Sequence, residues 1–149
     1  TRYASQGLLV PDFLTVRLWQ QHVERLIADE LFCPATDVLL LDGIPRSEPQ
    51  AEMMNDHIDP FIIVHLVCED IDQMVARMQN RATEQGRPDD ADESVIRRRF
   101  KVYAEQTAPV LACYDKSIIL NIDALGTQIE VLQRILTAIV PGMNAYKEN

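Results

Sequence analysis

The sequence is poor in cysteine, lacks a long apolar run and carries no surplus of basic residues. Its three cysteines, Cys33, Cys68 and Cys113, are widely separated and form no C-x-x-C pair. This spacing argues against a disulfide framework or a zinc site, and it favours reduced, mostly buried thiols in a cytoplasmic protein. No stretch is apolar for long enough to span a membrane, and no signal peptide is visible.

The shortage of basic residues limits the kinds of partner. A net charge of −9 argues against a nucleic acid or an anionic membrane as partner, because both recruit surplus Lys and Arg. Small anionic molecules remain possible ligands, since a local arginine cluster can bind them inside an acidic protein. We therefore expect small-molecule ligands, with no nucleic acid and no membrane among the partners.

The apolar pattern predicts one α/β domain. A chain of 149 residues with 47% hydrophobic content is long enough for one domain with a substantial core. Three apolar runs read as strands: Val38–Leu41, Phe61–Cys68 and Ile118–Ile122. They alternate with helical patterns, which implies parallel pairing through right-handed crossovers. Three strands make a thin sheet for this many helices, so a strand is expected to be missing.

Capping residues predict where the helices begin and end. Asp12 is expected to cap the first helix, and Glu69-Asp70 the third. Ser47-x-x-Gln50 and Thr127-x-x-Glu130 have the spacing of capping boxes. A long helix is expected from about Glu93, with a second piece from Pro109 to Tyr114. The last helix is expected to run to Val140 and to stop at Pro141-Gly142.

Six arginines lie in or beside a polar loop at residues 82–92, which has almost no apolar anchor and is expected to be mobile. They are Arg77, Arg81, Arg87, Arg97, Arg98 and Arg99. Guanidinium groups bind phosphate in a bidentate manner, so the arginines could close around a polyphosphate. Alternatively, the segment is a solvated helical hairpin, with Glu93 paired to Arg97 and with Asp89, Asp90 and Asp92 neutralising other arginines. Consecutive helical residues point about 100° apart, so Arg97, Arg98 and Arg99 do not all face one ligand.

A second cluster lies just after the predicted strand at Val38–Leu41. Asp42 could hold Mg²⁺ through its water shell, Arg46 could bind a phosphate near a helix N-terminus, and the Gln50 amide matches the edge of adenine. The alternative is that Asp42 caps a turn while Arg46 and Gln50 face solvent. His65, inside the second predicted strand, is more readily a hydrogen-bonded core histidine than a catalytic one.

Taken together, these residues resemble the adenylate kinase family of nucleoside monophosphate kinases. The similarity extends from Gly7 to about Ile139. The matching segments are GLLVPD, LLLDGIPRSEPQAE, VARMQNR, GRPDDADESVIRRRFKVYAEQTAPVLACY and the closing strand with IDALG. The resemblance implies a P-loop kinase-like fold in one domain over residues 1–149. That fold has a three-layer parallel sheet with helices on both faces and a short lid at about 82–92.

The resemblance also implies an activity and a set of site residues. The reaction is reversible phosphate transfer from ATP to AMP, giving two ADP, with Mg²⁺ bound. AMP would be bound by Leu8, Val10, Gly43, Arg46, Gln50 and Arg98, and ATP by Arg77, Arg81, Ala124 and Leu125. Arg81, Arg87 and Arg99 would contact the transferring phosphates, and Asp42 would order the hydration shell of Mg²⁺.

The main departure from the family is at the start of the chain. Ile44 and Ala124 stand where the family has phenylalanine and glycine, which is tolerable. The family begins with a strand and a glycine-rich, lysine-containing phosphate loop, and no G-x-x-x-x-G-K occurs in this sequence. Without this loop, the chain should transfer phosphate poorly or not at all.

The missing phosphate loop has two interpretations. In the first, the chain is part of an adenylate kinase whose N-terminal segment is missing, a monomer when complete; the first residue, threonine, favours this. In the second, it is a relative without a P-loop that binds nucleotides or assembles with partners without catalysis. The missing strand would then be supplied by a partner chain or a domain swap.

Overall fold

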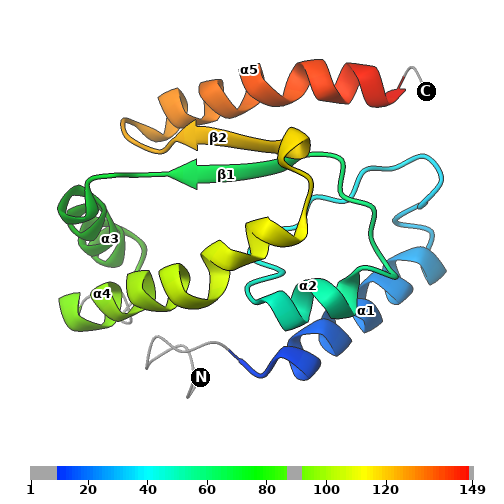
Figure 1. The fold of residues 1–149 in the computed structure, drawn as a ribbon, viewed down its shortest axis with the longest axis horizontal. Helices are drawn as coiled ribbons and strands as arrows, with labels where there is room; N and C mark the ends of the chain where they lie inside the picture. Colours follow the sequence, from blue (N-terminus) through cyan, green and yellow to red (C-terminus); the bar gives the residue numbers. More distant parts are fainter. Residues whose placement is uncertain (1–9, 87–91, 148–149) are drawn as a thin grey trace.

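A computed structural model describes residues 10–86 and 92–147, which fold as helices around two strands (Figure 1). The α-helices are α1 (Asp12–Ala28), α2 (Glu48–Met54), α3 (Ile71–Gln85), α4 (Glu93–Val102) and α5 (Gln128–Lys147), and the strands are β1 (Ile63–Val67) and β2 (Ile119–Asp123). A π-helix, η3 (Tyr103–Thr107), and two 3-10 helices, η4 (Ala108–Cys113) and η5 (Lys116–Ile118), connect α4 to β2. This mixture confirms the α/β class.

β1 and β2 form a parallel pair, as the sequence predicts. Ile63 lies opposite Ile119, and the register continues to Val67 opposite Asp123. Figure 1 shows α5 running alongside β2, with α1 and α2 together on the other side of the molecule. Because the strands are parallel, the turns that follow β1 and β2 lie next to each other, at the carboxyl ends of the strands. Ligands of α/β proteins commonly bind at this end of the sheet.

The predicted strand at Val38–Leu41 is not formed in this structure. The apolar composition of the segment predicts a strand buried on both faces, but Leu40 is 90% exposed. Strand backbone groups need a hydrogen-bonded neighbour, and within the described ranges β1 pairs with β2 alone. The segment therefore has the composition of a strand but pairs with neither β1 nor β2.

Of the two predicted capping boxes, the one at α5 is complete and the one at α2 has only its serine cap. At α5, the Thr127 hydroxyl accepts from the Glu130 N–H (3.3 Å), and the Glu130 carboxylate accepts from the Thr127 N–H (2.7 Å). At α2, the Ser47 hydroxyl accepts from the Gln50 N–H (3.3 Å). The Gln50 side chain, however, accepts from the N–H of Arg46 rather than from that of Ser47. This shift joins α2 to the turn that precedes it.

The last helix does not stop at Pro141, contrary to the prediction. α5 continues through this proline to Lys147. Packing compensates for the backbone hydrogen bond that proline removes. A Cβ on Gly142 would lie 2.8 Å from Ile62 Cδ1, so the helix sits close against the chain entering β1. One turn later, Tyr146 stacks on Phe61 with ring centroids 4.2 Å apart. These contacts hold the final turns.

The predicted polar loop begins later than residue 82. Asp70 caps α3, accepting from the Gln73 N–H (2.9 Å), and the helix runs on to Gln85. Gly86 ends it in the left-handed conformation with φ 61°. Residues 82–85 are therefore helical, and the remainder of the expected lid at 87–91 lies outside the described residues. Pro109 stands in the 3-10 helix η4, close to the predicted second helical piece.

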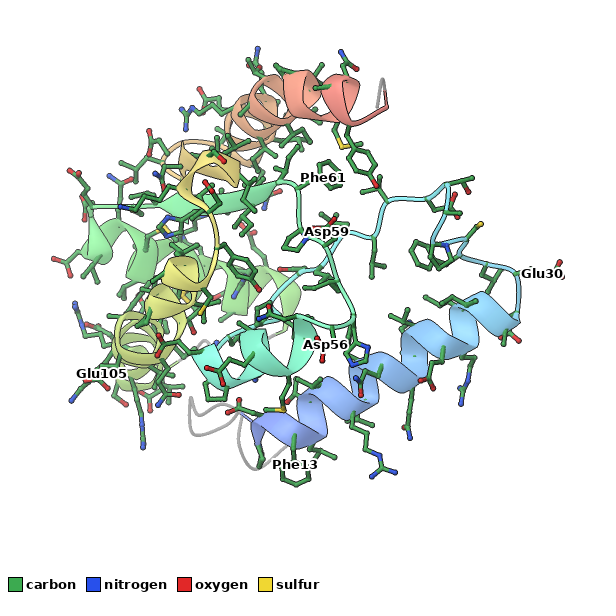
Figure 2. The ribbon with its side chains drawn as sticks, turned by 45° about the vertical axis from the view of Figure 1, so that its right-hand side comes forward. Phe13, Glu30, Asp56, Asp59, Phe61 and Glu105 are labelled. Atoms are coloured by element: carbon green, nitrogen blue, oxygen red, sulfur yellow. The ribbon has the colours of Figure 1, made fainter. Side chains whose placement is uncertain are left out.

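The buried core of the described residues is smaller than the apolar content suggests. It consists of Val16, Ala51, Met54, Val75, Ile96, Val110, Ile122, Ala124 and Val131. Figure 2 shows Phe13 projecting away from α1, and this side chain is 67% exposed. In the part of the chain that the structure describes, no helix has the length and apolarity needed to cross a membrane.

The prediction of mostly buried thiols is wrong. The cysteines are free, but Cys33 and Cys113 are exposed and Cys68 is half-buried. Cys33 lies in the connection after α1, and Cys113 is the last residue of η4. Neither side chain is part of the buried core. Hydrogen bonds from Thr36 and the Ala35 backbone lower the pKa of the Cys33 thiol.

Candidate functional site

The turn between the Val38–Leu41 segment and α2 holds Arg46 in a defined position. Gly43 adopts φ 73°, in the left-handed region that favours glycine. Its carbonyl accepts from Arg46 Nε (2.7 Å), and a Cβ at Gly43 would clash with the guanidinium group. Arg46 is exposed and forms no ion pair with the described residues. The turn thus presents a fixed cation at the N-terminal end of α2.

Gln50 is buried beside this cation. Its side chain is 2% exposed, and both ends of the amide are hydrogen-bonded. Oε1 accepts from the Arg46 N–H (2.8 Å), and Nε2 donates to the Asp12 carboxylate (2.7 Å). An amide can form two hydrogen bonds at each end, so one donor and one acceptor position remain. A ligand reaches them only when neighbouring side chains move aside.

Asp12 also belongs to this cluster, although the sequence predicts it as the cap of the first helix. The prediction that it caps α1 is wrong: Pro11 is the N-cap residue, and it forms no side-chain cap bond. Asp12 Oδ1 instead accepts from the Ser47 hydroxyl (2.8 Å) and from Gln50 Nε2. Because these partners lie more than 30 residues away in sequence, no local pattern could reveal them. The carboxylate thereby joins α1 to α2.

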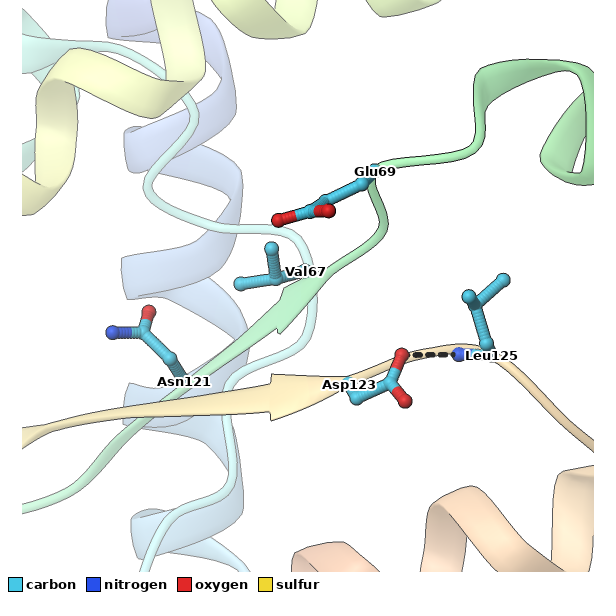
Figure 3. A pocket seen from close by; sticks show the side chains of 5 residues that line it. All are labelled: Val67, Glu69, Asn121, Asp123 and Leu125. Carbon is cyan, nitrogen blue, oxygen red and sulfur yellow. Dashed lines mark hydrogen bonds between the residues drawn. The ribbon is translucent and has the colours of Figure 1, made fainter.

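A second cluster lies at the carboxyl ends of β1 and β2. An open pocket of about 590 Å³ is lined by Val67, Glu69, Asn121, Asp123 and Leu125 (Figure 3). The Asp123 carboxylate accepts from the Leu125 N–H (2.9 Å), as Figure 3 shows. The pocket therefore combines apolar surface from Val67 and Leu125 with two carboxylates.

Further contacts join this cluster to the helices. Arg77 of α3 donates to the carbonyl of the buried Ala124 (3.0 Å). Arg134 of α5 donates to the carbonyls of Asp123 and Leu125 and lies 3.6 Å from the Asp123 carboxylate. Three of the predicted ATP-binding residues, Arg77, Ala124 and Leu125, are thus brought together around one turn.

Among the arginines of α3 and α4, the ion pairs of Arg97 bear on the two interpretations of this segment. Arg97 supports the hairpin interpretation, since it pairs with Glu93 and with Asp72 at 2.8 Å each. The hydrogen bonds that Arg97 donates to the carboxylates of Asp72 and Glu93 raise its pKa. Arg98 is exposed on α4, while Arg99 and Arg81 are half-buried. Two other predicted site residues, Leu8 and Arg87, lie outside the described residues, as do Asp89 and Asp90.

The π-helix η3 links both clusters to α4. Tyr103 at its start makes a hydrogen bond through its hydroxyl to His65 Nε2 (2.7 Å), and His65 Nδ1 pairs with Asn121 Oδ1 (2.8 Å). Thr107 at its end donates to the carbonyl of Arg46 (2.9 Å). Burial raises the pKa of Tyr103. The expected hydrogen bonds of His65 are therefore confirmed, but its expected place in the core is wrong, because the residue is only half-buried.

The described residues contain no group of three or more His, Cys, Asp or Glu side chains arranged to hold a metal ion. Asp42, the predicted magnesium residue, is a lone exposed carboxylate. A single carboxylate does not form a protein cage, but it is compatible with a Mg²⁺ ion that keeps its own waters.

Comparison with known proteins agrees with the motifs. No protein-family model matches the chain. The adenylate kinase of Kocuria rhizophila is 38% identical over 143 residues, which cover 93% of this chain and 72% of the relative. The adenylate kinases of Thermobifida fusca and Mycobacterium ulcerans are each 36% identical, covering 92% and 93% of this chain and 71% of each relative. At this identity and coverage, the chain belongs to the adenylate kinase family.

Proposed function

We propose that this chain forms the AMP-binding part, and some of the ATP-binding part, of an enzyme that converts ATP and AMP to two ADP. The observation that carries the proposal is the junction of α1 and α2. There, a buried glutamine amide and an exposed arginine are fixed next to each other by the Arg46 N–H. An anchored cation and an amide suit the phosphate and the base of a nucleoside monophosphate.

In this proposal each cluster contacts one nucleotide. Arg46, with Arg98, binds the AMP phosphate, and Gln50 reads the adenine edge beside Leu8, Val10 and Gly43. Arg77, Ala124 and Leu125 hold the adenine of ATP, since Leu125 lines the pocket at the sheet edge. Arg81, Arg87 and Arg99 contact the transferring phosphates. Little covalent chemistry is required, because phosphoryl transfer depends mainly on positioning and charge stabilisation.

Asp42 is proposed to orient the water shell of Mg²⁺. When bound, the ion would neutralise charge on the phosphates. Asp42 precedes the Gly43–Arg46 turn, so a carboxylate and a cation are offered by one short segment. A cytoplasmic location, which the family resemblance suggests, is part of the same proposal.

Binding of AMP tests the first part of the proposal. Titration calorimetry with AMP should show saturable binding to the chain, and Arg46→Ala should weaken it by about tenfold or more, as expected for a lost charge-assisted contact. Arg97→Ala is the matched control, because Arg97 is already paired with Glu93 and Asp72. Equal affinities in the two variants would remove Arg46 from the site.

The chain by itself is proposed to be inactive until a further strand and a phosphate loop join it. β1 has no partner on its second edge among the described residues, and Val64, Leu66 and Leu40 are exposed (36%, 47% and 90%). An added strand along β1 would pair with its free backbone edge, and a loop after that strand would lie at the carboxyl ends of β1 and β2, beside the pocket lined by Val67 and Leu125. Such an addition would build the three-layer sheet expected from the family.

This part is tested by complementation. The chain is mixed with a peptide that carries a strand, a G-x-x-x-x-G-K loop and a helix of the family type, and ADP formation from ATP and AMP is measured. Activity should appear with the peptide and should be lost when the loop lysine is replaced by alanine. If AMP binds but no peptide restores transfer, the chain is instead a nucleotide-binding or assembly module.

A further inference from the structure

We infer that Asp12, together with the backbone N–H of Arg46, sets the preference of this site for adenine over 6-oxopurines, because the two groups fix the orientation of the Gln50 amide. This inference rests on the proposed AMP site. It concerns Asp12, a residue that neither the motifs nor the family resemblance places in that site. The physical basis is the near symmetry of a glutamine side chain.

A glutamine amide can turn by 180° and exchange its donor and acceptor ends at almost no change in shape. Adenine presents an acceptor at N1 and a donor at its 6-amino group. Hypoxanthine presents the opposite pattern, a donor at N1 and an acceptor at O6. A glutamine that is free to turn therefore pairs with either base, and it discriminates between them only when something else fixes its orientation.

Two groups fix Gln50 in this structure. The Asp12 carboxylate can only accept, so the amide end 2.7 Å from it must be the NH₂ group. The Arg46 N–H can only donate, so the end 2.8 Å from it must be the oxygen. Turning the amide would place its oxygen against a carboxylate and its NH₂ against an N–H group. Because Gln50 is 2% exposed, water does not readily replace the lost bonds.

The position of the Asp12 side chain is itself stabilised by a second hydrogen bond. Its Oδ1 accepts from the Ser47 hydroxyl (2.8 Å) as well as from Gln50, and Asp12 lies in the first turn of α1. Ser47 contributes to the position of the carboxylate, but it does not determine the polarity of the amide. The two residues therefore differ in expected effect, although both stabilise the same junction.

The test compares the affinities of AMP and IMP, which share ribose and phosphate and differ at the two positions that Gln50 would read. In Asp12→Asn, the new amide can donate or accept, so either orientation of Gln50 is satisfied on that side. The ratio of the IMP and AMP dissociation constants, measured by calorimetry, should fall by about tenfold, the effect of one charge-assisted hydrogen bond. Ser47→Ala should leave the ratio within about twofold while lowering stability, so a merely structural role of Asp12 is distinguished.

Each outcome is decisive. A ratio unchanged in Asp12→Asn, with AMP binding intact, overturns the inference and leaves the AMP site standing. Absence of AMP binding to the unaltered chain overturns the proposed function and the inference together. If Asp12→Asn does not fold, hydrogen exchange of the Gln50 side-chain amide in the unaltered chain replaces it. One slowly exchanging proton supports the anchored orientation, and fast exchange of both overturns it.

Discussion

Replacing Ser47 with alanine removes two hydrogen bonds from the junction between α1 and α2. The hydroxyl accepts from the Gln50 N–H at the start of α2 and donates to the Asp12 carboxylate, and Ser47 is only 8% exposed. A lost N-cap costs about 1 kcal/mol. A lost bond to a charged group costs about 1.5–3 kcal/mol. Asp12 is half-buried and water can replace part of that bond, so we expect Ser47→Ala to lower the free energy of unfolding by about 2–3 kcal/mol.

The measurement is urea unfolding followed by circular dichroism and by the fluorescence of Trp19, the single tryptophan, which lies on α1. Ser94→Ala is the matched control. Ser94 also donates to a carboxylate at a helix start, that of Asp92 (2.7 Å), but both residues are exposed. Ser94→Ala should therefore lower the free energy of unfolding by less than about 0.5 kcal/mol. Equal effects of the two substitutions would refute the argument that burial makes the Ser47 bonds important.

Other predictions concern the core, the acid stability and the end of the last helix. Met54→Ala should destabilise the chain by about 2–5 kcal/mol in urea unfolding, because Met54 is fully buried, whereas the neighbouring Met53→Ala should cost far less because Met53 is 38% exposed. Hydrogen bonds from the Thr127 backbone and hydroxyl hold the pKa of Glu130 below its usual value of 4.5. Its stabilising contribution is therefore fully present above pH 4.5 and is lost as the pH falls through the lower folded value. The difference in melting temperature between Glu130→Gln and the unaltered chain should accordingly shrink on acidification below pH 4.5, and a constant difference would contradict this. Tyr146→Ala should lower the helical circular dichroism signal by fraying the last turns of α5, and an unchanged signal would show that its ring stacking does not hold them.

Local patterns predict the parts of the fold that depend on local physics. The β-branched run around β1 and the capping residues at Asp70 and Thr127 predict their elements within a few residues, because the forces involved act within one turn or one strand. The same logic fails at Val38–Leu41. Its composition is that of a buried strand, but a strand forms only when a neighbouring strand supplies hydrogen bonds. The local pattern of apolar residues does not show whether such a neighbour is present.

Long-range packing accounts for the other differences. Pro141 is a local signal for the end of α5, but the helix continues beyond it. Gly142 and Tyr146 pack against Ile62 and Phe61, some 80 residues earlier in the chain, and stabilise the last turns. In the candidate site, Arg46 and Gln50 could be selected from their place between a strand-like run and a helix start. Asp12 could not, because its partners lie 35 and 38 residues away. The roles assigned to Arg46 and Gln50 remain predictions.

The π-helix η3 has a consequence for insertions and deletions. A π-turn holds one more residue than an α-turn, so it changes the angular phase between the helix before it and the helix after it. Here the preceding helix carries Arg98 and Arg99, and η4 on the other side buries Val110 in the core. Deleting one residue from 104–106 would restore α-helical spacing and rotate the arginines by about 100° relative to the buried Val110. The length of this five-residue segment therefore sets the direction in which the arginines point, and a one-residue deletion should be less well tolerated here than in an exposed loop.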